Sequence, residues 1–89
     1  MDITQKHRDF AAGPMGKKLV TDLAGIGPIL GAKLRDKGFK YAYNVVGQYL
    51  VLNKNEEKFK DWLCKKCPAD AGQQNDCFNC VKGWCDAHA

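Results

Sequence analysis

The fold of this chain depends on one stretch, Leu23-Ala24-Gly25-Ile26-Gly27-Pro28-Ile29-Leu30-Gly31-Ala32-Lys33-Leu34. An apolar segment runs into a Gly-Ile-Gly turn, and Pro28 then opens a second segment with apolar residues at helical spacing. Proline suits the first position of a helix, because its missing N–H would be unpaired there in any case. Gly38 fits just beyond the end of that helix. The pattern predicts two small helices joined by a glycine hairpin, a helix-hairpin-helix over about residues 20–38.

The hairpin has the features of a phosphate-binding site. Gly25 and Gly27 lack a Cβ, which lets the backbone turn tightly and approach another surface closely. The free N–H groups at the start of the second helix attract an anion, assisted by the helix dipole. Lys33 follows one turn later. The alternative is a structural turn whose glycines serve packing alone, since Gly-x-Gly by itself is a weak motif. On a basic chain, we expect the anion to be a nucleic-acid phosphate.

Length and charge limit the function classes. The chain has 89 residues, of which 45% are hydrophobic, and this makes one domain, 1–89, with enough apolar side chains for a core. A domain this small buries a limited share of its surface, so a partner subunit is plausible. The formal net charge of +4 permits anionic partners without proving them.

Targeting signals do not appear in the sequence. The first twelve residues are polar and charged, unlike a signal peptide. No apolar run approaches the roughly 20 residues that a membrane span needs. We therefore expect a soluble, intracellular protein without direct membrane insertion.

The remaining segments show helical spacing and no strand alternation, so the sequence predicts an all-α fold of five helices. Thr4 and Asn55 are suitable N-caps for the first and fourth of these helices. Besides the helix that begins at Pro28, we expect helices over Gln5–Ala12, over Tyr41–Leu52, between Asn55 and Pro68, and from Asn75 or Asp76, or one turn earlier, to about Asp86.

The helix expected over 41–52 is apolar on more than one face. Its stripe at helical spacing comprises Ala42, Val45, Val46, Tyr49 and Leu50, and the next two residues widen it. A wide stripe suggests that one side packs on the subunit's own core and the other on a second chain. Gly47 costs about 1 kcal/mol relative to alanine in such a helix. Close approach of another backbone would explain it, and a merely tolerated glycine is the alternative.

Five cysteines include two CxxC pairs, Cys64/Cys67 and Cys77/Cys80, separated by nine residues. Two such pairs are the usual signature of a four-thiolate zinc site. Here both pairs fall in predicted helices, and the first lacks the glycine of a zinc knuckle. Buried, reduced thiols are the favoured interpretation. A zinc site and an isolated disulfide such as Cys80–Cys85 remain as alternatives, and we expect no cofactor.

The sequence shows no group of residues with the pattern of a catalytic site. No carboxylate cluster suggests metal-assisted hydrolysis. No cysteine and histidine are placed for nucleophilic attack. We therefore expect no enzymatic activity.

Five segments together point to a known family: Thr4-Gln5-Lys6-His7-Arg8-Asp9-Phe10, Pro14-Met15-Gly16, Leu23-Ala24-Gly25-Ile26-Gly27, Gly47-Gln48-Tyr49-Leu50-Val51-Leu52 and Gly83-Trp84-Cys85-Asp86. Through them the chain resembles the barrier-to-autointegration factor family over essentially its whole length. The resemblance implies an obligate homodimer of compact helical subunits. Each subunit would bind double-stranded DNA without sequence preference, so that one dimer bridges two duplexes.

The same resemblance implies a place in the cell and a set of partners. It implies a chromatin-associated protein of the nucleus and nuclear envelope, also found in the cytoplasm, that compacts chromatin. LEM-domain proteins of the inner nuclear membrane and lamins would be its protein partners.

Site residues carried over by position form four groups. The resemblance implies DNA contacts from Gln5, Lys6, Gly25, Ile26, Gly27, Ile29, Leu30 and Lys33. It implies a dimer interface that includes Gly47, Trp62, Cys80 and Cys85. It further implies a groove for LEM domains near Phe39, Leu50 and Val51, and phosphorylation at Thr4.

The chain also departs from the family pattern. Gly72 stands where the family usually has a lysine that touches DNA, and Cys64 is an additional cysteine. The C-terminal Ala87-His88-Ala89 replaces large apolar residues, which we expect to loosen the last helix. Gly72 leaves open a paralogue that dimerises and binds protein partners but binds DNA weakly or not at all. A zinc-stabilised interaction module is the other alternative.

Overall fold

A computed structural model describes residues 3–88 of the chain, with side chains from Gln5 onward. The described residues form five α-helices and one short 3₁₀ helix. In chain order these are α1 (Ile3–Ala12), η1 (Val20–Asp22), α2 (Pro28–Asp36), α3 (Ala42–Val51), α4 (Glu56–Lys66) and α5 (Ala71–His88). The predicted all-α, five-helix fold is confirmed. Among the described residues, the only strand-like feature is an isolated bridge between Leu19 and Tyr41.

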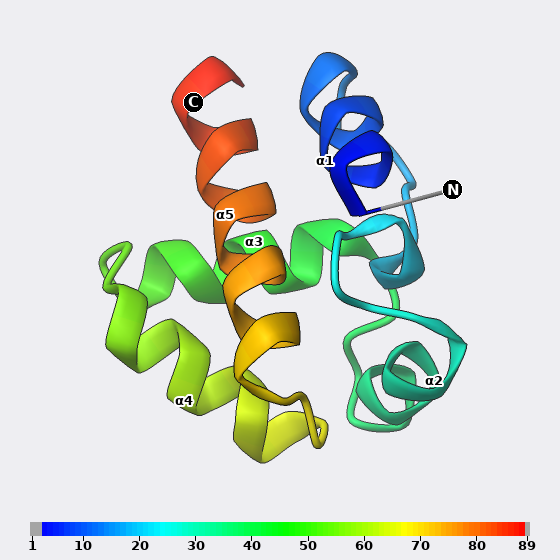
Figure 1. The fold of residues 1–89 in the computed structure, drawn as a ribbon, viewed down its shortest axis with the longest axis vertical. Helices are drawn as coiled ribbons and strands as arrows, with labels where there is room; N and C mark the ends of the chain where they lie inside the picture. Colours follow the sequence, from blue (N-terminus) through cyan, green and yellow to red (C-terminus); the bar gives the residue numbers. More distant parts are fainter. Residues whose placement is uncertain (1–2, 89) are drawn as a thin grey trace.

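The longest helix, α5, is the axis around which the other elements are arranged (Figure 1). Helix α1 lies along the C-terminal half of α5, and α4 lies along its N-terminal half (Figure 1). Helix α3 crosses behind α5, and η1 and α2 lie together on the other side of α5 from the start of α4, with α2 near the C-terminal end of α4 (Figure 1). No described helix is long and apolar enough to cross a membrane.

The starts of α4 and α5 follow the capping signals. The Asn55 side chain accepts a hydrogen bond from the Lys58 N–H at 2.8 Å, as an N-cap should. Helix α5 begins at Ala71, about one turn before Asn75 or Asp76, which is the earlier of the expected starts. Its cap is Asp70, which accepts from the Gln73 N–H at 2.8 Å, while the Asp70 N–H donates to the Gln73 side chain at 2.9 Å. This reciprocal pair satisfies two N–H groups at once and outweighs the later caps.

The first helix and the hairpin differ from expectation. Helix α1 begins at Ile3, so Thr4 lies inside it rather than capping it, and the Thr4 side chain is outside the described residues. The first helix of the hairpin motif is a single 3₁₀ turn, Val20–Asp22, held by Asp22, whose carboxylate accepts from the Leu19 N–H at 3.0 Å. A single turn is enough, because it has only to bring the chain into the hairpin.

The core is formed by apolar side chains from every described helix. Three rings meet at its centre, with centroids of Tyr49 and Phe59 5.7 Å apart and those of Tyr49 and Phe78 6.0 Å apart. Edge-on rings at such distances add to the stabilisation from burial. The largest fully buried side chains also include Phe10, Leu23, Ile26, Leu34 and Leu63.

The C-terminal end of α1 is closed by side chains from other elements. Lys18 donates from Nζ to the carbonyl oxygens of Asp9 (3.3 Å) and Phe10 (3.2 Å). The indole N–H of Trp84 donates to the Gly13 oxygen at 3.0 Å. His88 contacts the Ala11 oxygen through Nε2 at 2.7 Å, and its ring stacks on that of Trp84. A helix end leaves its last carbonyls unpaired, and here they are satisfied from outside.

The polar C-terminus therefore does not shorten the last helix. Helix α5 continues to His88, two residues beyond the expected end, and this residue ties α5 to α1. A glycine in the same helix makes room for α1, because a Cβ at Gly83 would lie 3.0 Å from Nε2 of His7.

The two hairpin glycines provide a matched test of the fold. Gly25→Ala should lower the free energy of unfolding by at least about 2 kcal/mol, because its left-handed backbone (φ 82°) disfavours a Cβ that would lie 2.6 Å from the Gln73 oxygen. Gly27→Ala should change stability by less than about 0.5 kcal/mol, since its Cβ would meet nothing within 4 Å. Urea unfolding of both variants measures the difference. Equal stabilities would contradict this account of the hairpin.

Candidate nucleic-acid interface

The hairpin between η1 and α2 is held against the first turn of α5. Gly25 is buried, and its missing Cβ lets the backbone pass close to Gln73 and to the Cβ of Asp76. Gly27 is different, because its φ of −93° suits any residue and the space around it is open. Gly25 is thus required by the subunit's own packing. Gly27 is not, and it leaves the backbone bare on the outer side of the hairpin.

Backbone N–H groups gather at this bare surface. Helix α2 has Gly27 as its N-cap without a capping side chain, and the first bond of the helix runs from the Gly31 N–H to the Gly27 oxygen at 2.8 Å. The N–H groups of Gly27, Ile29 and Leu30 have no partner among the described residues. They lie at the positive end of the helix dipole, an arrangement that favours a phosphate oxygen.

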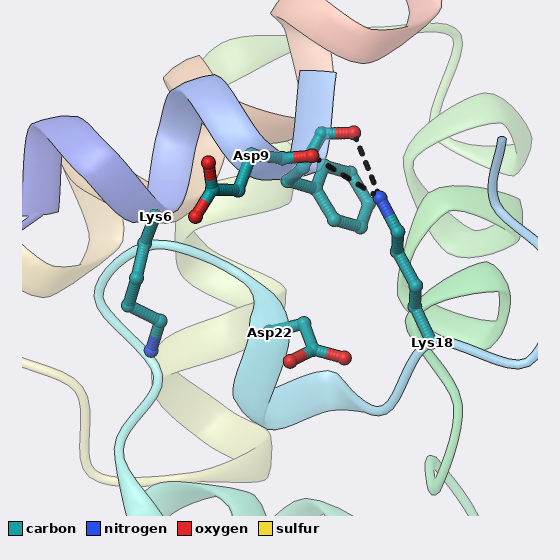
Figure 2. A pocket seen from close by; sticks show the side chains of 5 residues that line it. Lys6, Asp9, Lys18 and Asp22 are labelled. Atoms are coloured by element: carbon teal, nitrogen blue, oxygen red, sulfur yellow. Dashed lines mark hydrogen bonds between the residues drawn. The ribbon is translucent and has the colours of Figure 1, made fainter. Parts of the chain in front are cut away.

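Two lysines flank these N–H groups. Lys33 is exposed on α2, one turn after the unpaired N–H groups. Lys6 reaches from α1 to the hairpin and donates from Nζ to the Ile26 oxygen at 2.9 Å. Figure 2 shows the Lys6 side chain extending from α1 toward the hairpin. The hydrogen bond holds the ammonium charge of Lys6 beside the hairpin.

The other residues expected at this site differ in exposure. Ile29 is 74% exposed, and Gln5 is exposed while its amide donates to the Asp9 carboxylate at 2.8 Å. The side chains of Ile26 and Leu30 are buried in the core. These two residues can therefore offer only their backbone to a ligand, whereas Ile29 can also offer its side chain.

A hollow of about 270 Å³ lies beside the hairpin, between α1 and η1 (Figure 2). Two lysines and two aspartates line it around Phe10: Lys6, Lys18, Asp9 and Asp22. All four form hydrogen bonds: Lys6 to the hairpin, Lys18 to the end of α1, Asp22 at the start of η1, and Asp9 to the Gln5 amide. The residues that line the hollow include neither a histidine nor a cysteine.

The cysteines are free thiols, and four of them are buried. Burial raises the pKa of the thiols of Cys67, Cys77, Cys80 and Cys85, so they stay protonated and unreactive at neutral pH. Cys64 alone is exposed. Among the described residues, no group of three or more histidine, cysteine or acidic side chains is arranged to hold a metal ion.

The second apolar face expected on α3 is present and exposed. Ala42, Val45, Val46 and Tyr49 are buried, whereas Val51 is 72% exposed and Leu50 is 45% exposed. Leu50 therefore lies on the outer face rather than in the buried stripe. Tyr43, also exposed, was missed from the sequence as a member of this outer face. Its spacing of four residues to Gly47 and eight to Val51 is the signal that would have found it.

Residues expected at protein interfaces are not all accessible. Gly47 and Trp62 are half-buried, and a Cβ at Gly47 would meet nothing within 4 Å. Phe39 is half-buried, with its ring 5.1 Å from that of Trp62. Cys80 and Cys85 are 0% and 2% exposed. Both thiols are therefore buried within the subunit, and their part in a dimer interface stays a prediction.

Known proteins of one family are similar to this chain over nearly its whole length. A family model described as "Barrier to autointegration factor" matches residues 1–88. The barrier-to-autointegration factor of Homo sapiens is 56% identical over 87 residues, which cover 98% of each chain. That of Drosophila melanogaster is 58% identical over 83 residues, 93% of this chain and 92% of the relative. Barrier-to-autointegration factor B of Xenopus laevis is 60% identical over 84 residues, 94% and 93% of the two chains.

Thiol chemistry tests the burial of the cysteines. Native protein should show one fast thiol, Cys64, when it is treated with an aromatic disulfide reagent, because access and thiolate fraction both control the rate. Unfolding in denaturant should expose all five thiols. Cys64→Ser should abolish the fast phase. Two or more fast thiols in the native protein would show that the α4–α5 packing is wrong.

Proposed function

The chain belongs to the barrier-to-autointegration factor family, and from this premise we propose that it is a non-sequence-specific DNA-binding homodimer that bridges two duplexes. Members of the family are small helical, non-enzymatic DNA-binding proteins that dimerise. The observation that carries the proposal for this chain is the set of unpaired N–H groups on the bare side of the hairpin, flanked by Lys6 and Lys33.

The proposed mechanism uses contacts that carry no base code. The N–H groups of Gly27, Ile29 and Leu30 donate to phosphate oxygens, while the two ammonium groups add long-range attraction. Phosphate contacts fix the position of a protein on DNA but do not read its sequence. Binding is therefore insensitive to sequence and strongly dependent on salt, because each neutralised phosphate releases counterions.

Dimerisation is what turns binding into bridging. The exposed face of α3, with Tyr43, Gly47, Leu50 and Val51, supplies an apolar surface that a single subunit leaves in water. We place the second subunit against the part of this face around Gly47, with Trp62 of α4 also at the interface. The hairpin lies between η1 and α2, against the first turn of α5 (Figure 1). Each subunit of the proposed dimer carries its own hairpin, one for each duplex.

Cellular roles follow from the same proposal. A bridging dimer compacts chromatin in the nucleus. A groove near Phe39, Leu50 and Val51 would receive LEM-domain proteins of the inner nuclear membrane, and lamins would be further partners at the nuclear envelope. Part of the protein would reside in the cytoplasm. Phosphorylation of Thr4 would add about −1.5 to −2 charges two residues before Lys6 and repel DNA.

One observation favours a second candidate function. Gly72 is exposed in the first turn of α5, so nothing fills the position of a DNA-contacting lysine there. A paralogue that keeps the dimer and the protein partners but binds DNA weakly fits this feature. DNA affinity separates the two candidates.

Lysine variants test the DNA site. Lys33→Ala with Lys6→Ala should abolish most duplex binding, because two charges beside the hairpin are lost. The wild type should show a slope of log affinity against log salt of about −3 to −4, from roughly 3 to 5 phosphate contacts. Gel shifts of random-sequence duplex at several salt concentrations measure both.

Matched controls keep this test specific. Lys58→Ala with Lys82→Ala removes the same charge from α4 and α5, away from α2, and should leave most of the affinity intact. Lys33→Ala alone keeps the hydrogen bond from Lys6 to Ile26. This single variant shows whether the double variant loses DNA affinity through lost charge or through a changed hairpin structure. Undiminished binding by a folded double variant of Lys6 and Lys33 would refute the assignment.

A glycine variant tests the dimer. Gly47→Gln places a long side chain where the subunit has open space, so the subunit should stay folded and gain close to 1 kcal/mol of helix propensity. The side chain should block the second backbone. Sedimentation should then report a monomer of 9.9 kDa for the variant and a dimer for the wild type. A variant that remains dimeric would move the interface elsewhere.

A further inference from the structure

A second basic surface lies between α2 and the end of α4. A hollow of about 530 Å³ is lined there by Lys33 and Asp36 on α2, by Lys37 at its C-cap, and by Cys64, Lys65 and Lys66 on α4. We call it the lysine groove. Its lining carries four lysines and one aspartate. A concave surface with an excess of one charge concentrates ions of the opposite charge.

Most of this positive charge is uncompensated. Lys65 pairs with Asp61 at 2.9 Å, outside the groove. Within residues that the structure describes, Lys33, Lys37 and Lys66 form no ion pair. Asp36 is exposed and offsets part of the charge on the α2 side. The groove therefore carries net positive charge that is open to an external anion.

The groove continues the hairpin surface along one helix. Ile29 and Lys33 are four residues apart and share one face of α2, and Lys37 follows four residues later as the C-cap of that helix. The eight steps from Ile29 to Lys37 span about 12 Å along the helix axis. Lys33 belongs to both surfaces. A single phosphate cannot reach both ends of this face, whereas a chain of phosphates can.

We propose that the lysine groove binds backbone phosphates of the same duplex that the hairpin engages, with Lys37 and Lys66 as the contacts beyond the hairpin. The proposal rests on the proposed DNA-binding function. It assigns an extended phosphate track to this chain and explains how DNA binding persists with glycine at position 72. The track runs from the start of α2 to the end of α4, next to the turn that leads into α5.

Salt dependence tests the track. Lys37→Ala with Lys66→Ala should make the slope of log affinity against log salt shallower by about 1.8, which is two contacts at about 0.9 each. The affinity should fall severalfold at low salt. The control pair Lys58→Ala with Lys82→Ala removes two charges outside the groove and should change the slope by less than half as much.

Cys64 provides a second readout inside the groove. It is the exposed thiol among the described cysteines, so an aromatic disulfide reagent labels it selectively. A saturating random-sequence duplex should slow this reaction at least fivefold in the otherwise unchanged protein. Cys64→Ser identifies the signal by removing it.

The outcomes separate the two proposals. The phosphate track is supported if the Lys37 and Lys66 variant has a shallower salt slope and if duplex DNA protects Cys64 of the wild type from the thiol reagent. Duplex binding by the wild type, with Cys64 unprotected and the slope of the Lys37 and Lys66 variant unchanged, overturns the track and leaves the hairpin site in place. No duplex binding by the wild type at low salt overturns both.

Discussion

The rest of the structure depends on one close approach, that of the hairpin backbone to the first turn of α5 at Gly25. A Cβ at this position would lie 2.6 Å from the Gln73 oxygen, and the backbone has a φ of 82°. Only glycine allows both the conformation and the contact. The contact fixes the direction in which α2 leaves the hairpin, and so the direction in which its unpaired N–H groups point. The contact at Gly25 thus determines both how the hairpin packs on α5 and how the N–H groups of α2 face a phosphate.

The same helix that receives the hairpin also holds the N-terminal helix. Trp84 and His88 of α5 satisfy carbonyls at the end of α1, and Lys6 of α1 donates to the hairpin. The described chain is therefore closed into a ring of contacts from α5 to α1, to the hairpin and back to α5. This ring holds the ammonium group of Lys6 and the N–H groups of α2 in one place. A small domain gains preorganisation in this way, because few side chains remain free to move when a ligand arrives.

The sequence predicted those features of the fold that depend on residues a few positions apart. The Asn55 cap and the wide apolar face of α3 depend on neighbours in sequence, and both are confirmed. Two starts of α5 were expected, at Asn75 or Asp76 and one turn earlier, and the reciprocal pair of Asp70 and Gln73 fixes the earlier one. The closing of α1 by His88 joins residues 77 positions apart, and no periodicity reveals such a contact.

The sequence predicted the kind of site, a phosphate-binding hairpin, better than it predicted the role of each residue in it. Gly25 and Gly27 look alike in the sequence, yet one serves packing and the other leaves open space, a difference set by α5. The family resemblance implied a dimer contact at Cys80 and Cys85, and both side chains are buried within the subunit, so their part in an interface stays a prediction. The lysine groove is assembled from two helices distant in sequence, so only the fold brings its charges together.

The most direct test of the account is a bridging measurement with two duplexes of different random sequence, one fixed to beads and one fluorescent. The wild-type protein should carry the fluorescent duplex to the beads as its concentration rises, and high salt should release it. Such a result requires two phosphate-binding surfaces on one dimer. Binding to each duplex alone without transfer of the second, or no binding to either, would contradict the claim that this chain is a DNA-bridging dimer.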